Sequence, residues 1–561
     1  MTPRLILCVL LLAATVVACP FVPGAARLAG AAQPSAGSEW RRRDDVSPPA
    51  LRREFRGLWV ASVANIDWPS RRGLPVADLR REMMTILGAA KRANFNAIVL
   101  QVRPACDALY RSDLEPWSEF LTGASGRPPP AEPEAGPEGS TYDPLVEWIR
   151  EAHALGLELH AWINPFRARH FESREPEAPA HVSNARPELV RRYGRYLWLD
   201  PGEERAREHT LAVALDIVTR YDIDGLHFDD YFYPYPEARQ PFPDDEPFAR
   251  ARAANPNLDR DDWRRANIDL FVRTLYERVK RAKPHVKVGI SPFGIWRPGS
   301  PPGVVGFDAY ASLYADARTW LRSGWLDYAA PQLYWPIESK GQPFGRLLDW
   351  WIDQNDMNRH IWPGLNASRI LAESAKGEGG APAASWEPGE IVNQVVRIRT
   401  AVEPLDRAGS PWGGGSIFFS AVALVQNRRG LADALVTPEG PFAAPALVPA
   451  SPWLRAPAGN ASPTAPAPPA LSIVPASGGL EIALPEAPDA RWWGIWNKRA
   501  RGWGFHLFPA DQLAAVGVIR GTGPRVLIPP GAGDAELQAV GAFWIDATGA
   551  ASPTTVLSRE R

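Results

Sequence analysis

The sequence predicts a (β/α)8 TIM barrel followed by a small C-terminal all-β domain of the fibronectin III type. Between residues 54 and 440, short β-rich runs alternate with longer segments of helical period, which is typical of a parallel sheet covered by helices. After residue 475, runs such as LEIAL and ARWWGIWN are separated by turn residues, as in a β-sandwich. An open, doubly wound sheet shows the same alternation and is the alternative for the first part.

Eight β-rich runs account for the expected barrel strands. They cover residues 55–61, 97–102, 157–163, 225–228, 286–291, 328–333, 360–364 and 415–420. Between them, apolar residues recur at helical spacing over 76–90, 145–155 and 268–279. We expect these stripes to face the core and assign them no other role.

The first residues predict export. An arginine precedes an apolar run at 5–17 that is too short to span a bilayer, and small residues follow, as in a signal peptide over residues 1–32. Residues 16–19 resemble a bacterial lipobox, which would place a lipid on Cys19. Cleavage near 25–32 without a lipid and a retained membrane anchor are the alternatives. We expect a cell-envelope protein, either periplasmic or an outer-membrane lipoprotein whose membrane contact is that lipid.

Composition divides the rest of the chain. Residues 33–53 are polar and rich in proline and charge, and we expect a tether there. The barrel domain then covers residues 54–440. Residues 441–475 are crowded with proline, alanine and serine, which predicts a semi-rigid linker before the β domain of residues 476–561.

Charge, cysteine content and motifs argue against several functional classes. The formal net charge is −1, so no basic surface is expected to capture nucleic acid. Cys8 and Cys19 lie in the signal segment, which leaves Cys106 without a disulfide partner and favours a packing role for it. The chain has no glycine-rich phosphate loop after a strand, no GxSxG elbow and no HExxH helix. We expect no cofactor and no metal.

The segment DGLHFDDYFYP, residues 224–234, holds two adjacent aspartates at the end of the fourth run. Crowding like charges costs free energy, so such a pair is expected to bind something or to react. Strand alternation places Leu226 and Phe228 on one face and Asp229 on the other. If the apolar pair packs outward against helices, Asp229 faces the mouth of the barrel.

We expect Asp229 to be the nucleophile or base of a carboxylate site. Asp230, at the junction of strand and loop, is expected to be the second carboxylate or to tune its neighbour. The alternative is structural: both acids would cap the following loop or pair with arginines such as Arg103 and Arg167.

The proton donor is less well determined by the sequence. Asp107, after the second run, is the leading candidate, with Asp67 and Glu115 behind it, and a loop-capping aspartate is an equal alternative for Asp107. His160 and His227 are candidates for general acids or carboxylate partners, although buried, hydrogen-bonded core histidines are more common.

Amides, arginines and aromatic rings accompany these acids at the ends of the runs. Such side chains bind hydroxyl groups and the C–H faces of sugar rings, and paired carboxylates support an oxocarbenium-like centre, so the mixture favours glycoside hydrolysis. The expected substrate-binding residues are Trp59, Asn65, Asp67, Gln101, Arg103, His160, Trp162, Asn164, Arg167, His227, Tyr231, Trp296, Gln332, Tyr334 and Trp335.

Six segments together resemble the glycosyl-hydrolase-like 10 family of bacterial envelope proteins. They are FRGLWVASVANIDWPS, VRPACDALYRSDLEPWSEFLTG, HAWINPFRAR, DGLHFDDYFYP, ISPFGIW and PQLYWP, and the likeness runs from about residue 55 to residue 420. The resemblance implies an exported (β/α)8 glycosidase, and some members carry a C-terminal fibronectin-like domain. At least one branch of the family cleaves peptidoglycan glycan strands from which the stem peptides have been removed.

Two details qualify this resemblance. A fainter likeness to α-amylase barrels, through the form D-G-x-x-x-D, also selects Asp229 as nucleophile, but no glutamate ends the fifth run here. Retention or inversion therefore stays open. Cys106 stands where the family's usual R-P-x-G-D has glycine, which alters the loop before Asp107 if that position requires a positive φ.

Three hypotheses follow from these residues. The first is an exported glycosidase whose substrate is a polysaccharide, namely peptidoglycan glycan strands. The second is a non-catalytic carbohydrate-binding protein of the envelope on a barrel scaffold. The third is a metal-dependent carbohydrate deacetylase that would use His160, His227 and Asp229.

Overall fold

The computed structural model describes residues 40–130, 142–237, 240–372, 385–407, 413–455, 466–476, 479–511, 525–528 and 536–559. They belong to one compact unit, Trp40–Arg561. The expected signal peptide with Cys19, and part of the expected linker, lie outside the described residues. None of the described helices is long and apolar enough to cross a membrane.

A curled parallel sheet forms the first part of the fold, and every pairing in it is parallel. In spatial order its strands are β12 (His360–Ile361), β11 (Tyr328–Ala329), β10 (Lys287–Ile290), β9 (Gly225–Phe228), β5 (Glu158–Ile163), β4 (Ala97–Arg103), β3 (Phe55–Val60), β14 (Gly415–Phe418) and β13 (Gly364–Leu365). The first and last strands are separated by only Trp362 and Pro363 in the chain. The sheet therefore curls as in a TIM-barrel-like α/β fold.

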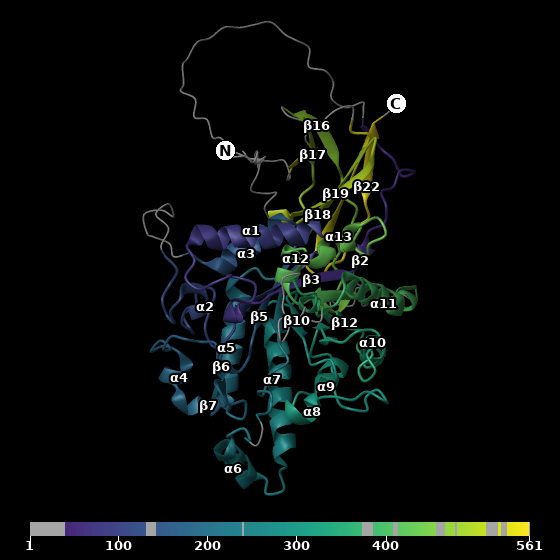
Figure 1. Ribbon diagram of the computed structural model, residues 1–561. Coiled ribbons are helices and arrows are strands. Elements are labelled where there is room, and N and C mark those ends of the chain that lie inside the picture. Colours follow the sequence, from purple (N-terminus) through teal and green to yellow (C-terminus); the bar gives the residue numbers. More distant parts are fainter. Residues whose placement is uncertain are drawn as a thin grey trace, which may run out of the picture. The chain divides into compact units, whose positions relative to one another are not determined.

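Helices follow the strands, and their predicted apolar stripes are confirmed as core. The long helices are α1 (Val76–Arg92), α3 (Pro144–Ala154), α5 (Glu204–Arg220), α6 (Asp245–Ala254), α7 (Arg260–Ala282), α10 (Phe344–Asp353) and α11 (Pro388–Arg407). Leu79 and Met83 of α1, and Ile268 and Phe271 of α7, are buried. Helices α5 and α7 pack side by side (Figure 1).

Short elements complete the loops of the curled sheet. They are α2 (Glu119–Thr122), α4 (Val182–Ala185), α8 (Ala309–Ser312), α9 (Ala317–Arg322), α12 (Ala421–Val425), α13 (Leu431–Val436), and a small antiparallel sheet of β6 (Arg167–Arg169), β8 (Tyr196–Leu199) and β7 (Val190–Tyr193). The small sheet follows β5 and carries Arg167 beside the end of β9.

The interior of the curled sheet is filled with rings, which explains two glycines in its strands. A Cβ added at Gly289 would lie 1.9 Å from the Tyr328 ring, and one at Gly225 would lie 2.5 Å from the His160 ring. The Tyr328 hydroxyl in turn lies 2.9 Å from His160 Nδ1 and 3.0 Å from His227 Nδ1. Glycine is required where these large side chains cross the interior.

The chain's last strands form antiparallel sheets. One has the order β1 (Trp40–Arg42), β22 (Thr555–Arg559), β21 (Ala539–Asp546), β18 (Ala490–Arg499) and β19 (Gly502–Pro509), and the other has the order β16 (Ser472–Ala476), β17 (Gly479–Ala483) and β20 (Arg525–Ile528). Strand β1 lies in the segment expected to be a tether. In addition, β2 (Arg52–Arg53) pairs in parallel with β15 (Ala446–Leu447). The fibronectin III assignment stays a prediction.

Candidate active site

Two adjacent carboxyl groups lie where β9 ends. Phe228 packs outward against Phe271 of α7, with 6.0 Å between ring centroids, so strand alternation turns Asp229 inward as the sequence predicted. The Asp230 backbone N–H donates to Asp229 Oδ1 at 3.0 Å. Both side chains are largely buried, with exposed fractions of 6% for Asp229 and 3% for Asp230.

The environment of this pair favours one proton on Asp230. Burial, the Asp229 charge and a hydrogen bond shared with Asp229 raise the pKa of Asp230 well above its usual value. Tyr235 donates its hydroxyl to Asp230 Oδ2. Within the described part of the chain, neither acid forms an ion pair with Arg103, Arg167 or any other cation, so the expected structural alternative of salt bridges is not seen.

Half-buried aromatic rings surround the two acids. Tyr235 is 41% exposed and lies 6.4 Å from Phe293, which lies 5.6 Å from Trp335. On another side, Tyr334 lies 6.1 Å from Phe419. Burial, and then the charges of Asp229 and Asp230, raise the pKa of Tyr334 well above its usual value. These rings offer apolar faces to a ligand that reaches the carboxyl groups.

Two polar side chains from neighbouring elements lie beside Asp229 and beside Tyr231, the residue that follows the pair. Gln332 Nε2 lies 3.3 Å from Asp229 Oδ1 and donates to the Ser291 carbonyl at 3.0 Å. The Arg167 guanidinium lies over the Tyr231 ring at 5.1 Å, and its Nε donates to the Pro104 carbonyl at 3.0 Å. Its Nη2 is buried without a hydrogen-bond partner among the described residues. A buried, unsatisfied donor of this kind is costly, so a substrate oxygen is a fitting partner for it.

Asp107 combines a structural contact with the electrostatics of an acid. Its Oδ1 accepts a hydrogen bond from the Ala105 N–H at 2.8 Å, so it caps its own loop. Burial, with a contribution from the Glu177 charge, raises the pKa of Asp107 to about 6. A carboxyl group whose pKa is raised toward neutral pH suits general acid catalysis. The preceding Cys106 has a φ of +54°, so the loop does use the positive φ for which the family has glycine.

The other two candidate proton donors are held in structural contacts. Asp67 Oδ1 accepts from the Ser420 hydroxyl and the Val422 N–H, each at 2.8 Å, which ties the loops after β3 and β14 together. Glu115 lies 2.5 and 2.7 Å from the Arg103 guanidinium, and both side chains are buried. Arg103, expected to bind substrate, therefore balances a buried carboxylate instead.

The two candidate histidines lie in the interior below the carboxyl pair. His160 Nε2 is 3.1 Å from Glu158, and His227 Nε2 is 3.0 Å from the Ser291 hydroxyl. Burial lowers the pKa of His227 well below its usual value, so the ring is neutral. With both ring nitrogens of each histidine engaged by protein groups, His160, His227 and Asp229 do not form the ligand set that the deacetylase hypothesis requires.

The remaining predicted residues divide into two groups. Trp59 donates from Nε1 to His227 at 3.3 Å, and Trp162 donates to Asn164 at 3.1 Å; both indole rings also pack against the His227 ring in the interior. Three others are engaged elsewhere: Asn65 donates to the carbonyls of Pro69 and Phe120, Gln101 accepts from the N–H groups of Ser62 and Val63, and Trp296 donates to Asp316.

Three ring residues that contact predicted site residues were not themselves predicted. They are Tyr235, Phe293 and Phe419. Tyr235 follows DGLHFDDYFYP directly, and Phe293 stands inside ISPFGIW, so proximity to a motif could have indicated both. Phe419 had no local feature that distinguishes it from a core phenylalanine.

Comparisons with known proteins agree with the resemblance. The chain is 37% identical over 411 residues to the glycosyl hydrolase YngK of Bacillus subtilis (strain 168), a match that covers 72% of this chain and 74% of that protein. It is 32% identical over 330 residues to the glycosyl hydrolase DigH of Escherichia coli (strain K12), covering 54% of this chain and 72% of DigH.

Solved structures give a weaker likeness. The PgaB (BpsB) glycoside hydrolase domain from Bordetella bronchiseptica matches with a TM-score of 0.41 and 15% identity, covering 68% of this chain and 98% of that domain. A TM-score below 0.5 supports no inference about chemistry.

The sequence model of the glycosyl hydrolase-like 10 family, by contrast, matches residues 54–378, more than half of the 561 residues. This chain belongs to the glycosyl hydrolase-like 10 family.

Proposed function

We propose that this protein is an exported glycoside hydrolase that cleaves glycosidic bonds in bacterial cell-wall glycan, namely peptidoglycan strands lacking stem peptides. The observation that carries the proposal is the carboxyl pair Asp229 and Asp230, ringed by half-buried aromatic side chains at the end of β9. Carboxylates of this kind stabilise an oxocarbenium-like centre, and the rings suit the C–H faces of sugars.

Asp229 is the nucleophile or base in this proposal, and Asp230 is its protonated partner. The two are neighbours in the chain and interact directly, whereas the acid and the nucleophile or base of a glycosidase flank the scissile bond, about 5–5.5 Å apart in retaining and about 6.5–9.5 Å apart in inverting enzymes. The acid that protonates the leaving oxygen therefore comes from another strand. Asp107, with its pKa of about 6, is the group proposed for that role.

Three variants test these roles on purified naked glycan strands. Asp229→Asn and Asp107→Asn are each expected to lower kcat by about 10²–10⁴-fold. On an aryl glycoside of the same sugar, whose leaving group needs no proton, Asp107→Asn retains the rate of glycosidic cleavage whereas Asp229→Asn does not. Asp113→Asn is the matched control, because Asp113 is an exposed carboxylate on the loop that also follows β4.

The results of these assays distinguish the hydrolase from the two alternative functions. Product from wild type that disappears in Asp229→Asn supports the enzyme, whereas glycan binding without product supports the envelope carbohydrate-binding alternative. Equal loss on both substrates in Asp107→Asn contradicts its role as acid. Undiminished hydrolysis after chelation argues against a metal-dependent reaction.

Export and lipidation are part of the same proposal and rest on residues 1–32. Mass spectrometry of the N-terminus of the protein isolated from cell envelopes distinguishes an acylated Cys19 from a free terminus between residues 25 and 33. A protein that retains Met1 in the cytoplasmic fraction would contradict export.

A further inference from the structure

A cavity of about 1010 Å³ lies away from the carboxyl pair. Arg52, Arg53 and Arg56 line it where β3 begins, and Gly413 lines it just before β14. Asp229, in contrast, follows the last residue of β9. Because these strands are parallel, the cavity lies at the N-terminal ends of the strands and the carboxyl pair lies at their C-terminal ends. Its volume is at the upper end of the range for small-molecule sites.

One wall of the cavity is cationic. Arg52, Arg53, Arg56 and Arg399 line it, and no acidic residue is among the described lining residues. Glu54, behind this wall, lies 2.7 Å from Arg56 and 2.6 Å from Arg399, so a single carboxylate serves two guanidinium groups. Over the described part of the chain, Arg52 and Arg53 have no acidic side chain within ion-pair distance.

The positive charge of this wall is only partly compensated, because four arginines line the cavity and Glu54 alone forms ion pairs with two of them among the described residues. Among the described residues, Arg53 donates to the carbonyls of Val448 and Gly549, at 2.9 and 2.7 Å. Burial lowers its pKa to about 10, although the Asp546 charge acts in the opposite direction. Burial also lowers the pKa of Arg56; the Glu54 carboxylate opposes this shift, whereas the charges of Arg399 and Arg52 add to it. An anion in the cavity would relieve this repulsion.

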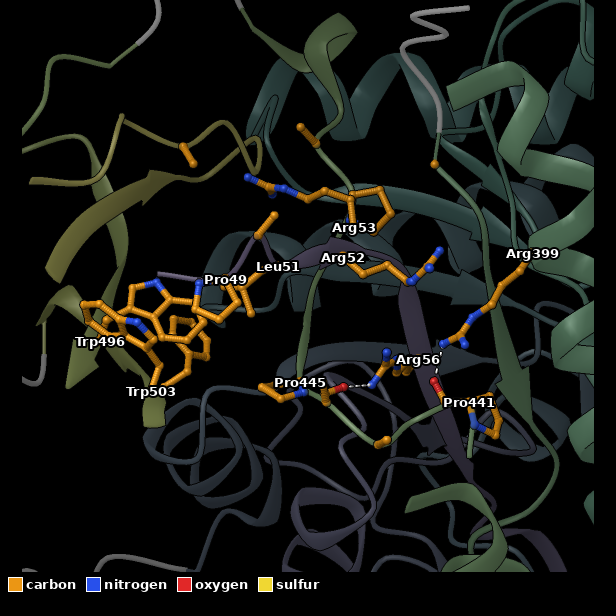
Figure 2. A pocket seen from close by; sticks show the side chains of 18 of the residues that line it. Pro49, Leu51, Arg52, Arg53, Arg56, Arg399, Pro441, Pro445, Trp496 and Trp503 are labelled. Atoms are coloured by element: carbon orange, nitrogen blue, oxygen red, sulfur yellow. Dashed lines mark hydrogen bonds between the residues drawn. The ribbon is translucent and has the colours of Figure 1, made fainter. Parts of the chain in front are cut away.

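The facing wall is aromatic and comes from the antiparallel sheet. Figure 2 shows Trp496 and Trp503 across the cavity from the arginines, with Pro49 and Leu51 beside them. Trp496 of β18 lies 4.8 Å from Phe505 and 6.1 Å from Trp503, both of β19. Trp503 and Phe505 are only partly buried, so their rings are accessible from the cavity.

We propose that this cavity binds an acidic sugar unit of a polysaccharide. Guanidinium groups bind a carboxylate with paired, charge-assisted hydrogen bonds, and the indole rings opposite pack against the C–H face of the sugar ring. A bare anion would leave the aromatic wall unused, and a neutral sugar would leave Arg52 and Arg53 without a carboxylate partner among the described residues. The inference is a second site beyond the proposed hydrolysis and does not rest on it.

Two matched pairs of sugars test this assignment by ligand-observed NMR titration of the whole protein. D-Glucuronic acid differs from D-glucose by its carboxylate, and N-acetylmuramic acid differs from N-acetylglucosamine by its lactyl carboxylate. We expect each acidic sugar to bind at least about tenfold more tightly than its neutral partner, because a charge-assisted contact is lost in the neutral one.

Substitutions of residues that line the cavity test whether the acidic sugars bind there. Arg52→Gln, an exposed position without a described ion pair, is expected to weaken binding of the acidic sugars about tenfold, and Trp503→Ala about three- to tenfold. Arg501→Gln is the matched control, since Arg501 is exposed in the turn between β18 and β19 but does not line the cavity. Glycan hydrolysis by Arg52→Gln stays at the wild-type rate, which separates this site from the carboxyl pair.

Four results would overturn the proposal. The first is equal affinity for the acidic and neutral sugars, and the second is unchanged binding in both Arg52→Gln and Trp503→Ala. The third is competition by inorganic phosphate that matches the acidic sugar while Trp503→Ala has no effect, which would mark a site for anions alone. The fourth is binding to phosphatidylglycerol vesicles, lost in Arg52→Gln, without binding of either acidic sugar.

Discussion

Glu115→Gln is the change that best separates a structural carboxylate from a catalytic one. Glu115 accepts from Arg103 Nε at 2.7 Å and from Arg103 Nη2 at 2.5 Å, and its Oε1 lies 2.8 Å from His209 Nε2. Glutamine has only one acceptor oxygen. If that oxygen keeps the contacts of Oε1, the new NH₂ group opposes the Arg103 Nε–H, and the guanidinium charge loses its counterion.

The expected loss of folding stability in Glu115→Gln is large because the ion pair is buried. Both side chains are essentially inaccessible, with exposed fractions of 0% for Arg103 and 1% for Glu115. Removing one partner of a buried ion pair costs about 3–5 kcal/mol, because the other charge stays buried and uncompensated. By comparison, the exposed pair Arg273–Glu277 at 2.8 Å is expected to contribute about 0.3–0.5 kcal/mol, so Glu277→Gln is the matched control.

Urea unfolding, monitored by tryptophan fluorescence, measures the loss of stability in Glu115→Gln as a lower urea concentration at the midpoint of unfolding. The double variant Arg103→Met/Glu115→Gln is expected to recover part of the loss, because the stranded charge is removed. Unchanged stability together with lost hydrolysis in Glu115→Gln would refute this reasoning and identify Glu115 as the proton donor.

The stability that ionised Glu115 contributes to the fold is expected to decrease as pH falls. Burial alone would raise the pKa of Glu115, but the Arg103 charge and hydrogen bonds, with His209, hold it well below its usual value. Its contribution is therefore present above the unfolded-state pKa of about 4.3 and is lost as pH falls. The stability difference between wild type and Glu115→Gln narrows below about pH 4.

Three further predictions concern the interior and the site. Gly289→Ala is expected to destabilise the fold by about 1–3 kcal/mol or more, because its Cβ would meet the Tyr328 ring at 1.9 Å; an unchanged thermal midpoint would contradict this packing. The Cys106 thiol is fully buried and its pKa is raised by burial, so a thiol-specific disulfide reagent is expected to modify it only in denaturant. Fast labelling of the native protein at Cys106 would show that its loop opens. Asp230 has a raised pKa, so its ionisation opposes folding as pH rises above the unfolded value of about 3.9. Thermal midpoints of Asp230→Asn relative to wild type should therefore increase with pH over that range, and a constant or falling difference would show that Asp230 is ionised in the fold.

Much of the curled sheet could be predicted because its physical causes are local. The helical spacing of Leu79, Met83 and Leu87 reports one buried face, and α1 buries those residues. In the same way, alternation along Gly225–Phe228 predicts which side of the strand faces the helices, and Phe228 indeed contacts α7. The adjacency of Asp229 and Asp230 is a property of the chain itself.

The β1 pairing could not be predicted from such local features. Residues Trp40–Arg42 are polar and charged, as in a tether, yet they pair with Arg559, Ser558 and Leu557 at the other end of the chain. The partner strand supplies the hydrogen bonds that the segment cannot provide for itself. Composition therefore carries no information about this contact.

By itself, the sequence determined the strand and helix periods, the family and the carboxyl pair, because each depends on residues close together in the chain. Only the tertiary structure decided which of the remaining acids are engaged in structural contacts. Glu115 meets His209 across 94 residues, and Asp67 meets Ser420 across 353. The protonation and availability of a carboxyl group depend on burial and on charges brought near it by folding, and that proximity is absent from the order of residues.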